Sequence, residues 1–194
     1  MIITTAMLLN ELKEYRSPAQ KISRMVKNES LFPIVRGLYE TDGNTPGYLL
    51  AASIYGPSYL SFDFALSFWG LIPEAVFSFT SATFDKKKRK QFVTPFGLFT
   101  YRDVPRKAYP FGIQILNEGD YSFFIANPEK ALCDKLYILP PMTSRKDVFH
   151  QIFDDLRIDQ ESFNKLNKER LTRYAQLYQS TNHKLLIKWL RSTQ

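Results

Sequence analysis

The chain has 194 residues, 44% of them hydrophobic, and carries a net charge of +7 from 26 Lys and Arg against 19 Asp and Glu. This length and composition suit one ordinary domain plus a small accessory one. The positive charge favours polyanionic partners and says nothing about the fold. A single cysteine excludes an internal disulfide, and with only two histidines beside it no tetrahedral zinc site of Cys and His can be assembled.

No segment of the sequence is typical of export or of a membrane span. Residues 1–10 contain no Lys or Arg, so the positively charged start of a secretory signal is missing. The longest apolar passage, residues 59–84, is broken by Asp63, Pro73 and Glu74, whereas a spanning helix needs about 18 uncharged apolar residues. We therefore expect a cytoplasmic protein that makes no contact with a membrane.

The beginning of the chain predicts two helices. A threonine at position 4 or 5 can cap a helix that runs to Tyr15, whose apolar residues are spaced four and three apart. Ser17-Pro18 then predicts the start of a second helix, because serine is favoured at the cap and proline at the first helical position. Asn28 is able to end this helix in a left-handed conformation.

A hairpin and a linker follow the second helix. The β-prone residues 31–35 and 38–40 lie on either side of Arg36-Gly37. The run 41–47 is dense in turn formers and is the best domain boundary in the sequence. We predict a winged helix-turn-helix domain over residues 1–45 and a second domain over residues 46–194.

The second domain is predicted to be mixed α/β, which makes the whole chain α+β. An antiparallel-rich sheet is expected up to about residue 137 and a helical tail over residues 145–194. Helices are predicted at 48–55, 62–69, from 128 to just before Pro140-Pro141, and at 148–156, 160–166, 168–179 and 183–191. Strands are predicted at 76–83, 92–94, 98–101, 111–116 and 121–125, with a polar turn at 85–91.

Two groups of polar and basic residues are candidates for binding DNA. A helix carrying small and basic side chains fits the major groove, and a basic hairpin tip reaches phosphate or the minor groove. The first group therefore comprises Ser17, Gln20, Lys21, Ser23, Arg24 and Lys27 on the second helix, with Arg36 on the hairpin. The alternative is a solvated amphipathic helix followed by an incidental hairpin.

The second group is a run of five basic residues expected in a turn between two strands. Its members can grip phosphates as point charges. Solubility and protection of a sheet edge explain such a run equally well. Arg102, Arg106 and Lys107 are expected in another loop of the same domain. The run consists of Lys86, Lys87, Lys88, Arg89 and Lys90.

Signals for enzymatic chemistry are weak. No glycine-rich phosphate loop is present, and Cys133 lies in a helical pattern that is typical of a core residue. A metal-dependent nuclease needs several converging carboxylates, and Asp120, Glu129 and Lys130 are the only suggestive set. We expect no enzyme and no cofactor, and keep a nucleic-acid-processing enzyme as the less favoured alternative.

Three segments, in this order, resemble motifs of a known family. Residues 32–39, FPIVRGLY, look like the hairpin that closes the winged helix of AbiEi-type antitoxins. Residues 56–66, GPSYLSFDFAL, with WGLIP at 69–73, are similar to that family's proline- and serine-containing segment. Residues 125–136, IANPEKALCDKL, resemble its I-A-x-P-E-[KR]-A-L-x-D signature. The sequence thus resembles the AbiEi family of type IV toxin–antitoxin systems, which act in phage abortive infection.

This resemblance implies an antitoxin that counteracts a nucleotidyltransferase-like toxin and represses their shared promoter by binding double-stranded DNA at inverted repeats. It leaves open whether the toxin is contacted directly, because type IV antitoxins are thought to oppose the toxin's effect without necessarily forming a stable complex. A regulator of the same architecture without a toxin partner is the other alternative.

The family pattern also bears on details of this chain. The family often has a further helix ahead of the pair found here, and the residues before Leu8 are too few for it, so the expected winged helix is minimal. Asn28-Glu29 stands where a glycine is common. Physical roles follow for some motif residues: Gly37 at positive φ, Tyr39 packed on Leu12 or Ile22, and Asp134 paired with Lys130.

Overall fold

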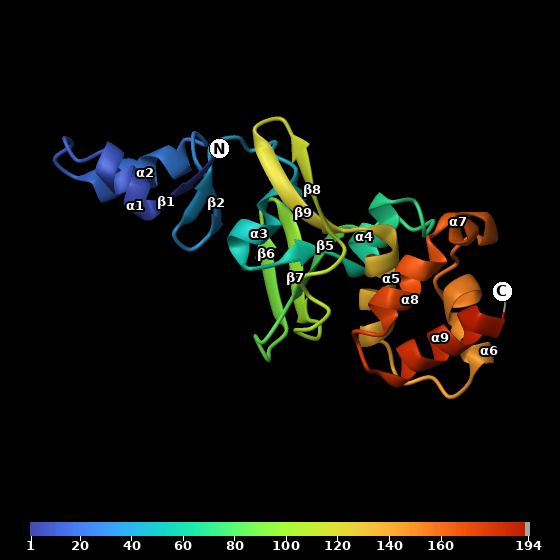
Figure 1. The fold of residues 1–194 in the computed structure, drawn as a ribbon. Coiled ribbons are helices and arrows are strands. Elements are labelled where there is room, and N and C mark those ends of the chain that lie inside the picture. Colours follow the sequence, from blue (N-terminus) through green and yellow to red (C-terminus); the bar gives the residue numbers. More distant parts are fainter. Residues whose placement is uncertain (193–194) are drawn as a thin grey trace.

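The computed structural model describes residues 1–192, which form three parts along an elongated molecule (Figure 1). A small N-terminal module lies at one end, a six-stranded sheet is in the middle, and a group of helices lies at the other end. The mixed α+β class predicted from the sequence is confirmed.

The N-terminal module contains two helices and a three-stranded antiparallel sheet. Strand β1 (Ile2–Thr4) precedes helices α1 (Thr5–Glu11) and α2 (Pro18–Lys27), and the hairpin of β2 (Phe32–Val35) and β3 (Leu38–Glu40) follows. The sheet order is β1-β3-β2. The sequence predicted both helices and the hairpin, although α1 ends earlier than expected, at Glu11, and β1 was not predicted.

Local side-chain chemistry explains where the two helices begin. The Thr4 hydroxyl accepts a hydrogen bond from the Met7 amide and caps α1. Pro18 occupies the first turn of α2, where its missing N–H costs nothing, whereas the Ser17 side chain makes no cap hydrogen bond.

The end of α2 differs from the expectation. Glu29, not Asn28, takes the left-handed conformation, with φ of 55°. The Ser30 amide donates to the Met25 carbonyl over 3.0 Å, and the Glu29 amide donates to the Val26 carbonyl over 3.2 Å. These are the two hydrogen bonds of a Schellman motif, in which the left-handed position is usually glycine. Helix α2 therefore ends in a Schellman motif whose left-handed position is occupied by Glu29, a residue that is strained in this conformation.

The two faces of the small sheet pack against different partners, because side chains alternate along a strand. Ile3 faces α1 and α2 and joins Leu8, Ile22 and Leu31 in a separate small core, against which Leu12 and Tyr39 also pack. Ile2, Ile34 and Leu38, on the other face, pack against the main core. The sequence predicted that Tyr39 packs on Leu12 or Ile22, and Tyr39 does pack against the small core that contains Ile22.

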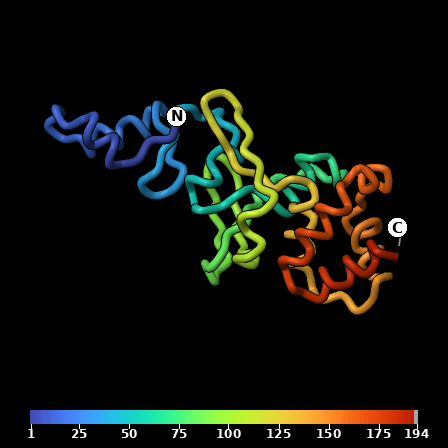
Figure 2. Tube along the Cα trace, viewed as in Figure 1, coloured from blue at the N-terminus to red at the C-terminus, as the bar shows by residue number. Residues whose placement is uncertain are grey.

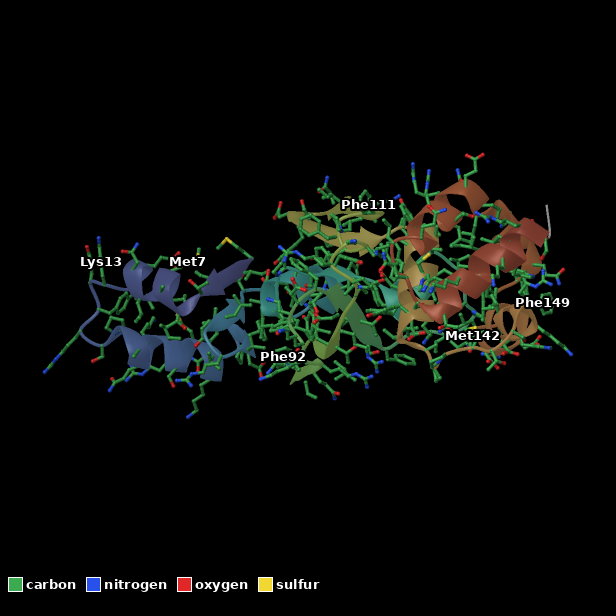
Figure 3. The ribbon with its side chains drawn as sticks, turned by 60° about the horizontal axis from the view of Figure 1, so that its bottom comes forward. Met7, Lys13, Phe92, Phe111, Met142 and Phe149 are labelled. Carbon is green, nitrogen blue, oxygen red and sulfur yellow. The ribbon has the colours of Figure 1, made fainter. Side chains whose placement is uncertain are left out.

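Glu40 strengthens the junction between the module and the larger sheet. Its side chain is fully buried and accepts a 2.7 Å hydrogen bond from the hydroxyl of Tyr121, on the hairpin of β8 (Ile113–Glu118) and β9 (Tyr121–Ala126). The Met1 amino group and the Thr41 and Asp42 amides donate to its other oxygen. In the tube view this hairpin, coloured yellow, stands beside the blue module (Figure 2).

The central sheet has the order β6-β7-β5-β4-β9-β8. It consists of β4 (Tyr59–Leu60), β5 (Ser78–Thr83), β6 (Lys90–Thr94), β7 (Gly97–Asp103), β8 (Ile113–Glu118) and β9 (Tyr121–Ala126). The pairs β4–β5, β6–β7 and β8–β9 are antiparallel, while β4–β9 and β5–β7 are parallel. The sheet is thus more mixed than predicted.

Helices lie before, between and after these strands. A 3₁₀ helix (Gly47–Leu50) continues into α3 (Ala51–Ile54), and α4 (Phe62–Phe68) follows β4. After β9 come α5 (Pro128–Ile138), α6 (Arg145–His150) with a π-helical turn (Gln151–Asp155), α7 (Gln160–Lys165), α8 (Lys168–Ala175) and α9 (Thr181–Ser192). The predicted tail helices are all present, with α6 beginning three residues earlier than expected.

Helix α5 is buried on nearly all sides and carries polar side chains into the core. Asn127 caps it by accepting a hydrogen bond from the Lys130 amide. The predicted ion pair between Lys130 and Asp134 is confirmed, with 3.1 Å between the Lys130 Nζ and an Asp134 oxygen and both side chains fully buried. Tyr59, Ser61 and Tyr178 donate to the same carboxylate. We call these residues the α5 polar network.

Candidate nucleic-acid interface

Helix α2 presents most of the predicted DNA-binding residues on one exposed surface. Its apolar residues lie on the opposite side, where Ile22 is buried and Met25 and Val26 pack against the small core. The helical period of 3.6 residues therefore turns the polar positions outward. Ser17, Gln20, Ser23, Arg24 and Lys27 are exposed and Lys21 is half-buried; with Arg36 we call them the α2 surface.

The cations of the α2 surface are not neutralised by neighbouring carboxylates. In the described part of the chain, Lys21, Arg24, Lys27 and Arg36 form no ion pair. The Lys21 Nζ lies 5.4 Å from the centre of the Tyr15 ring, which holds its stem against the helix pair. Arg24 and Lys27 are in the last turn of α2, where the helix dipole favours positive charge.

The hairpin places Arg36 beside the start of α1. Gly37 follows it with φ of +84°, as predicted, and its carbonyl accepts a 3.0 Å hydrogen bond from the Thr5 amide. This bond fixes the turn, because the Arg36-Gly37 backbone is tied to the neighbouring helix. The exposed Arg36 side chain therefore projects from an anchored turn.

The second basic group does not act as a single unit in the structure. The Lys86 Nζ donates to the Gly56 carbonyl over 3.0 Å and lies 5.0 Å from the centre of the Tyr55 ring, so it supports the fold. Lys87, Lys88 and Arg89 are exposed in the turn, and Lys90 is an exposed residue of β6 rather than of the turn. The four cationic side chains from Lys87 to Lys90 are thus the ones that remain available to a ligand.

Arg102 also differs from its expected place. The sequence predicts it in a loop, but it lies within β7, next to Asp103. Burial, together with the nearby Arg89 charge, lowers the pKa of Arg102, while Asp63 opposes this effect. The sequence did not single out Arg102 as a candidate site residue, because one arginine within a strand does not stand out as a run of basic residues does.

The residues suggested for metal chemistry are not brought together. Asp120 immediately precedes β9 and Glu129 follows it, so the length of a six-residue strand, about 20 Å, separates them. Glu129 is buried and accepts a 2.9 Å hydrogen bond from the Asn167 amide at the start of α8. Among residues 1–192, no group of three or more His, Cys, Asp or Glu side chains is arranged to hold a metal ion.

The α5 polar network and its neighbours are inaccessible. Burial raises the pKa of Cys133 far above its usual value, and the negative Asp134 adds to this effect while Lys130 opposes it. Burial also raises the pKa values of Tyr59 and Tyr178 well above normal, with the Asp134 charge adding to the shift. These groups stay protonated inside a packed core and are not exposed to a dissolved reactant.

None of the helices within residues 1–192 has the length and apolar character needed to cross a bilayer. Comparison of the chain with models of known protein families and with curated proteins finds no match.

Proposed function

We propose that this protein is a DNA-binding transcriptional regulator of the AbiEi type, an antitoxin that represses its own promoter through an N-terminal winged helix. The observation that carries this proposal is the exposed cationic side of α2, whose charges have no acidic partner in the described residues. Such a surface attracts phosphate and gains free energy by releasing counterions.

The order of elements in the module supports α2 as the recognition helix. Two helices precede a hairpin, and in the sheet order β1-β3-β2 the hairpin strand β2 lies at one edge. The outer face of this sheet packs on the main core through Ile2, Ile34 and Leu38, so the α2 surface is left facing away from the larger domain. A duplex is able to reach it without a domain rearrangement.

The side chains of the α2 surface suit distinct tasks in this proposal. Lys21, Lys27 and Arg36 provide phosphate contacts, which fix position without reading sequence. Gln20 and Ser23 have the amide and hydroxyl groups that read base edges in the major groove. Arg24 is central on the surface and is suited to a bidentate contact with guanine, worth about 1–3 kcal/mol of discrimination.

Antitoxicity against a nucleotidyltransferase-like toxin is proposed from the three family-like segments. The third of them, residues 125–136, builds the buried α5 polar network and offers little surface for contact. If the toxin is touched, the contact must therefore involve exposed residues outside this segment.

Titration of promoter DNA with the full-length protein tests the regulatory role. Arg24→Ala should weaken binding to a duplex from upstream of the protein's own gene by ~5- to 150-fold if Arg24 reads guanine. Lys27→Ala should weaken all duplexes alike and reduce the slope of log affinity against log salt by about one. Lys184→Ala, which removes an exposed charge on α9, is the control. Equal affinity of wild type and both α2 variants would refute the proposed interface.

Co-expression with a neighbouring nucleotidyltransferase-like protein tests the antitoxin role. Rescue of growth by the wild-type chain supports it, and promoter binding without rescue assigns the protein to regulators without a toxin partner. Magnesium-dependent cleavage of nucleic acid that is lost in Asp120→Asn, a substitution of the exposed member of the suggested metal set, would instead support an enzyme.

A further inference from the structure

A cationic cavity lies far along the chain from the α2 surface, between the turn before β6 and the end of α5. Its volume is about 370 Å³, and four cationic side chains and one carboxylate line it together with an aromatic and an apolar residue. The lining residues are Lys87, Lys88, Arg89, Arg102, Asp103, Tyr137 and Ile138. We call it the Arg102 cavity.

The one carboxylate of the cavity is already occupied by other donors. The Thr83 hydroxyl donates to one Asp103 oxygen and the Lys87 amide donates to the other, each over 2.6 Å. Asp103 thus shapes the turn and does not pair with the cations: within residues 1–192, the four basic side chains form no ion pair. Unneutralised charges around a concave surface focus a positive potential inside it.

Arg102 is the fixed member of the set. It lies in a strand paired on both sides, with Ala82 in β5 as its partner, and it also lines an adjacent cavity of about 320 Å³ that contains Asp63 and Lys135. Asp63 is neutralised by Lys135, whose Nζ lies 2.6 Å from one of its oxygens. Arg102 is therefore a partly desolvated cation whose acidic neighbours are committed elsewhere.

One wall of the cavity includes an aromatic side chain. Tyr137 is 37% exposed, and its ring packs against that of the buried Tyr178, with 5.7 Å between ring centres. An anchored, partly exposed ring beside several cations is the combination that proteins use to stack a base while holding its phosphates. A cavity of this size, 370 Å³, falls in the range that encloses a small ligand.

We propose that the Arg102 cavity binds the phosphates of a nucleotide, with Arg89 and Arg102 as phosphate ligands and Tyr137 stacking on the base. This goes beyond the regulatory function and does not depend on α2. The same chemistry is offered by a free nucleoside triphosphate and by a single-stranded nucleic acid. The site differs from the α2 surface in that Arg102 of β7, the turn before β6 and Tyr137 at the end of α5 line one open pocket.

Calorimetric titration of the full-length protein with four ligands tests this proposal. ATP and inorganic tripolyphosphate should both bind, while adenosine, which lacks phosphate, should not. Arg102→Gln and Arg89→Gln should each weaken both phosphate ligands by roughly ten- to hundredfold, the value of a charge-assisted hydrogen bond. Tyr137→Ala should weaken ATP by at least fivefold and leave tripolyphosphate unchanged, since only ATP has a base to stack. A single-stranded oligonucleotide is the fourth ligand.

The control and the competing outcomes are set by the same titrations. Lys184→Ala is the control: it removes one positive charge, as each arginine variant does, and should bind all four ligands as tightly as the wild type does. Arg89 is exposed, so its variant keeps the fold even if Arg102→Gln loses stability. Tight oligonucleotide binding with weak ATP binding assigns the site to nucleic acid, and the reverse assigns it to free nucleotides. The proposal for the Arg102 cavity is overturned if no phosphate ligand binds the wild type, or if Arg89→Gln binds these ligands as tightly as the wild type does. Failure of promoter binding, by contrast, overturns only the proposed α2 interface.

Discussion

Protonation of His183 should destabilise the helical end of the molecule at mildly acid pH. The ring is buried, stacks on Tyr178 with 4.2 Å between centres, and its Nε2 donates to the Cys133 carbonyl over 3.0 Å. Its Nδ1 accepts from the Ser180 hydroxyl over 2.7 Å. Burial lowers the pKa of His183 from 6.5 to about 4, with the Lys130 charge adding to this effect and the Cys133 carbonyl opposing it.

The sign and size of the effect follow from proton linkage. Below pH 6.5 the unfolded chain takes up a proton at this position that the folded chain refuses until about pH 4. The contribution of neutral His183 to the unfolding free energy is therefore fully present above pH 6.5 and is lost as the pH falls toward 4. Between pH 7 and pH 5 the expected loss is about 2 kcal/mol of unfolding free energy.

Urea denaturation at both pH values, compared between wild type and His183→Gln, measures this loss. The variant has no imidazole to protonate, so its stability should change by about 2 kcal/mol less than that of the wild type over the same interval. His150→Gln is the comparison variant, because it removes the other imidazole, which is exposed and contacts Asp154, and so shows the effect of losing an imidazole outside the core. Equal pH dependence in wild type and His183→Gln would refute the burial argument.

Three other pairs of variants test the fold and the α2 surface. Asp134→Asn should cost about 3–5 kcal/mol in urea denaturation, because it leaves the Lys130 charge buried without its counter-ion. The double variant Lys130→Met with Asp134→Leu should recover only part of this loss, because the hydroxyls of Tyr59, Ser61 and Tyr178 then lose their acceptor. Thr4→Ala should cost about 1 kcal/mol while Ser17→Ala costs almost nothing, because only Thr4 makes its cap hydrogen bond. Glu29→Gly should raise the unfolding free energy by about 1 kcal/mol, because glycine adopts the left-handed conformation without strain. Glu29→Gln keeps the strained conformation and should not raise the unfolding free energy. Both variants should bind duplex DNA more tightly, because each removes a negative charge beside α2.

Signals that act within a few residues were readable from the sequence. The Thr4 cap, Pro18 and Pro128 in first helical turns, and Gly37 at positive φ each depend on backbone chemistry close to the residue itself. The Lys130–Asp134 pair follows from helical spacing in the same way. Strands β1 and β4 were missed because they are two or three residues long and form only by pairing with distant partners, β1 with β3 and β4 with β5 and β9.

The candidate sites divide along the same line. The polar side of α2 was predictable because a 3.6-residue period sorts apolar from exposed positions. The run from Lys86 to Lys90 was not, because its members separate by contacts with remote residues: Lys86 reaches Gly56, while the backbone of Lys87 is held by Asp103. No local pattern places Arg102 from β7 beside Tyr137 from α5.

The distribution of burial also decides where function is to be sought. The segment most like a family signature, residues 125–136, contains a lysine, an aspartate and a cysteine that all lie at zero exposure. Buried polar groups that are fully hydrogen-bonded specify a unique core and are costly to disturb. A substitution such as Asp134→Asn lowers the stability of the helical end together with any activity, and so cannot locate a site. Substitutions of exposed cations, such as Arg24 on the α2 surface and Arg89 in the Arg102 cavity, change charge on an intact core, and for that reason they separate the binding roles from the fold.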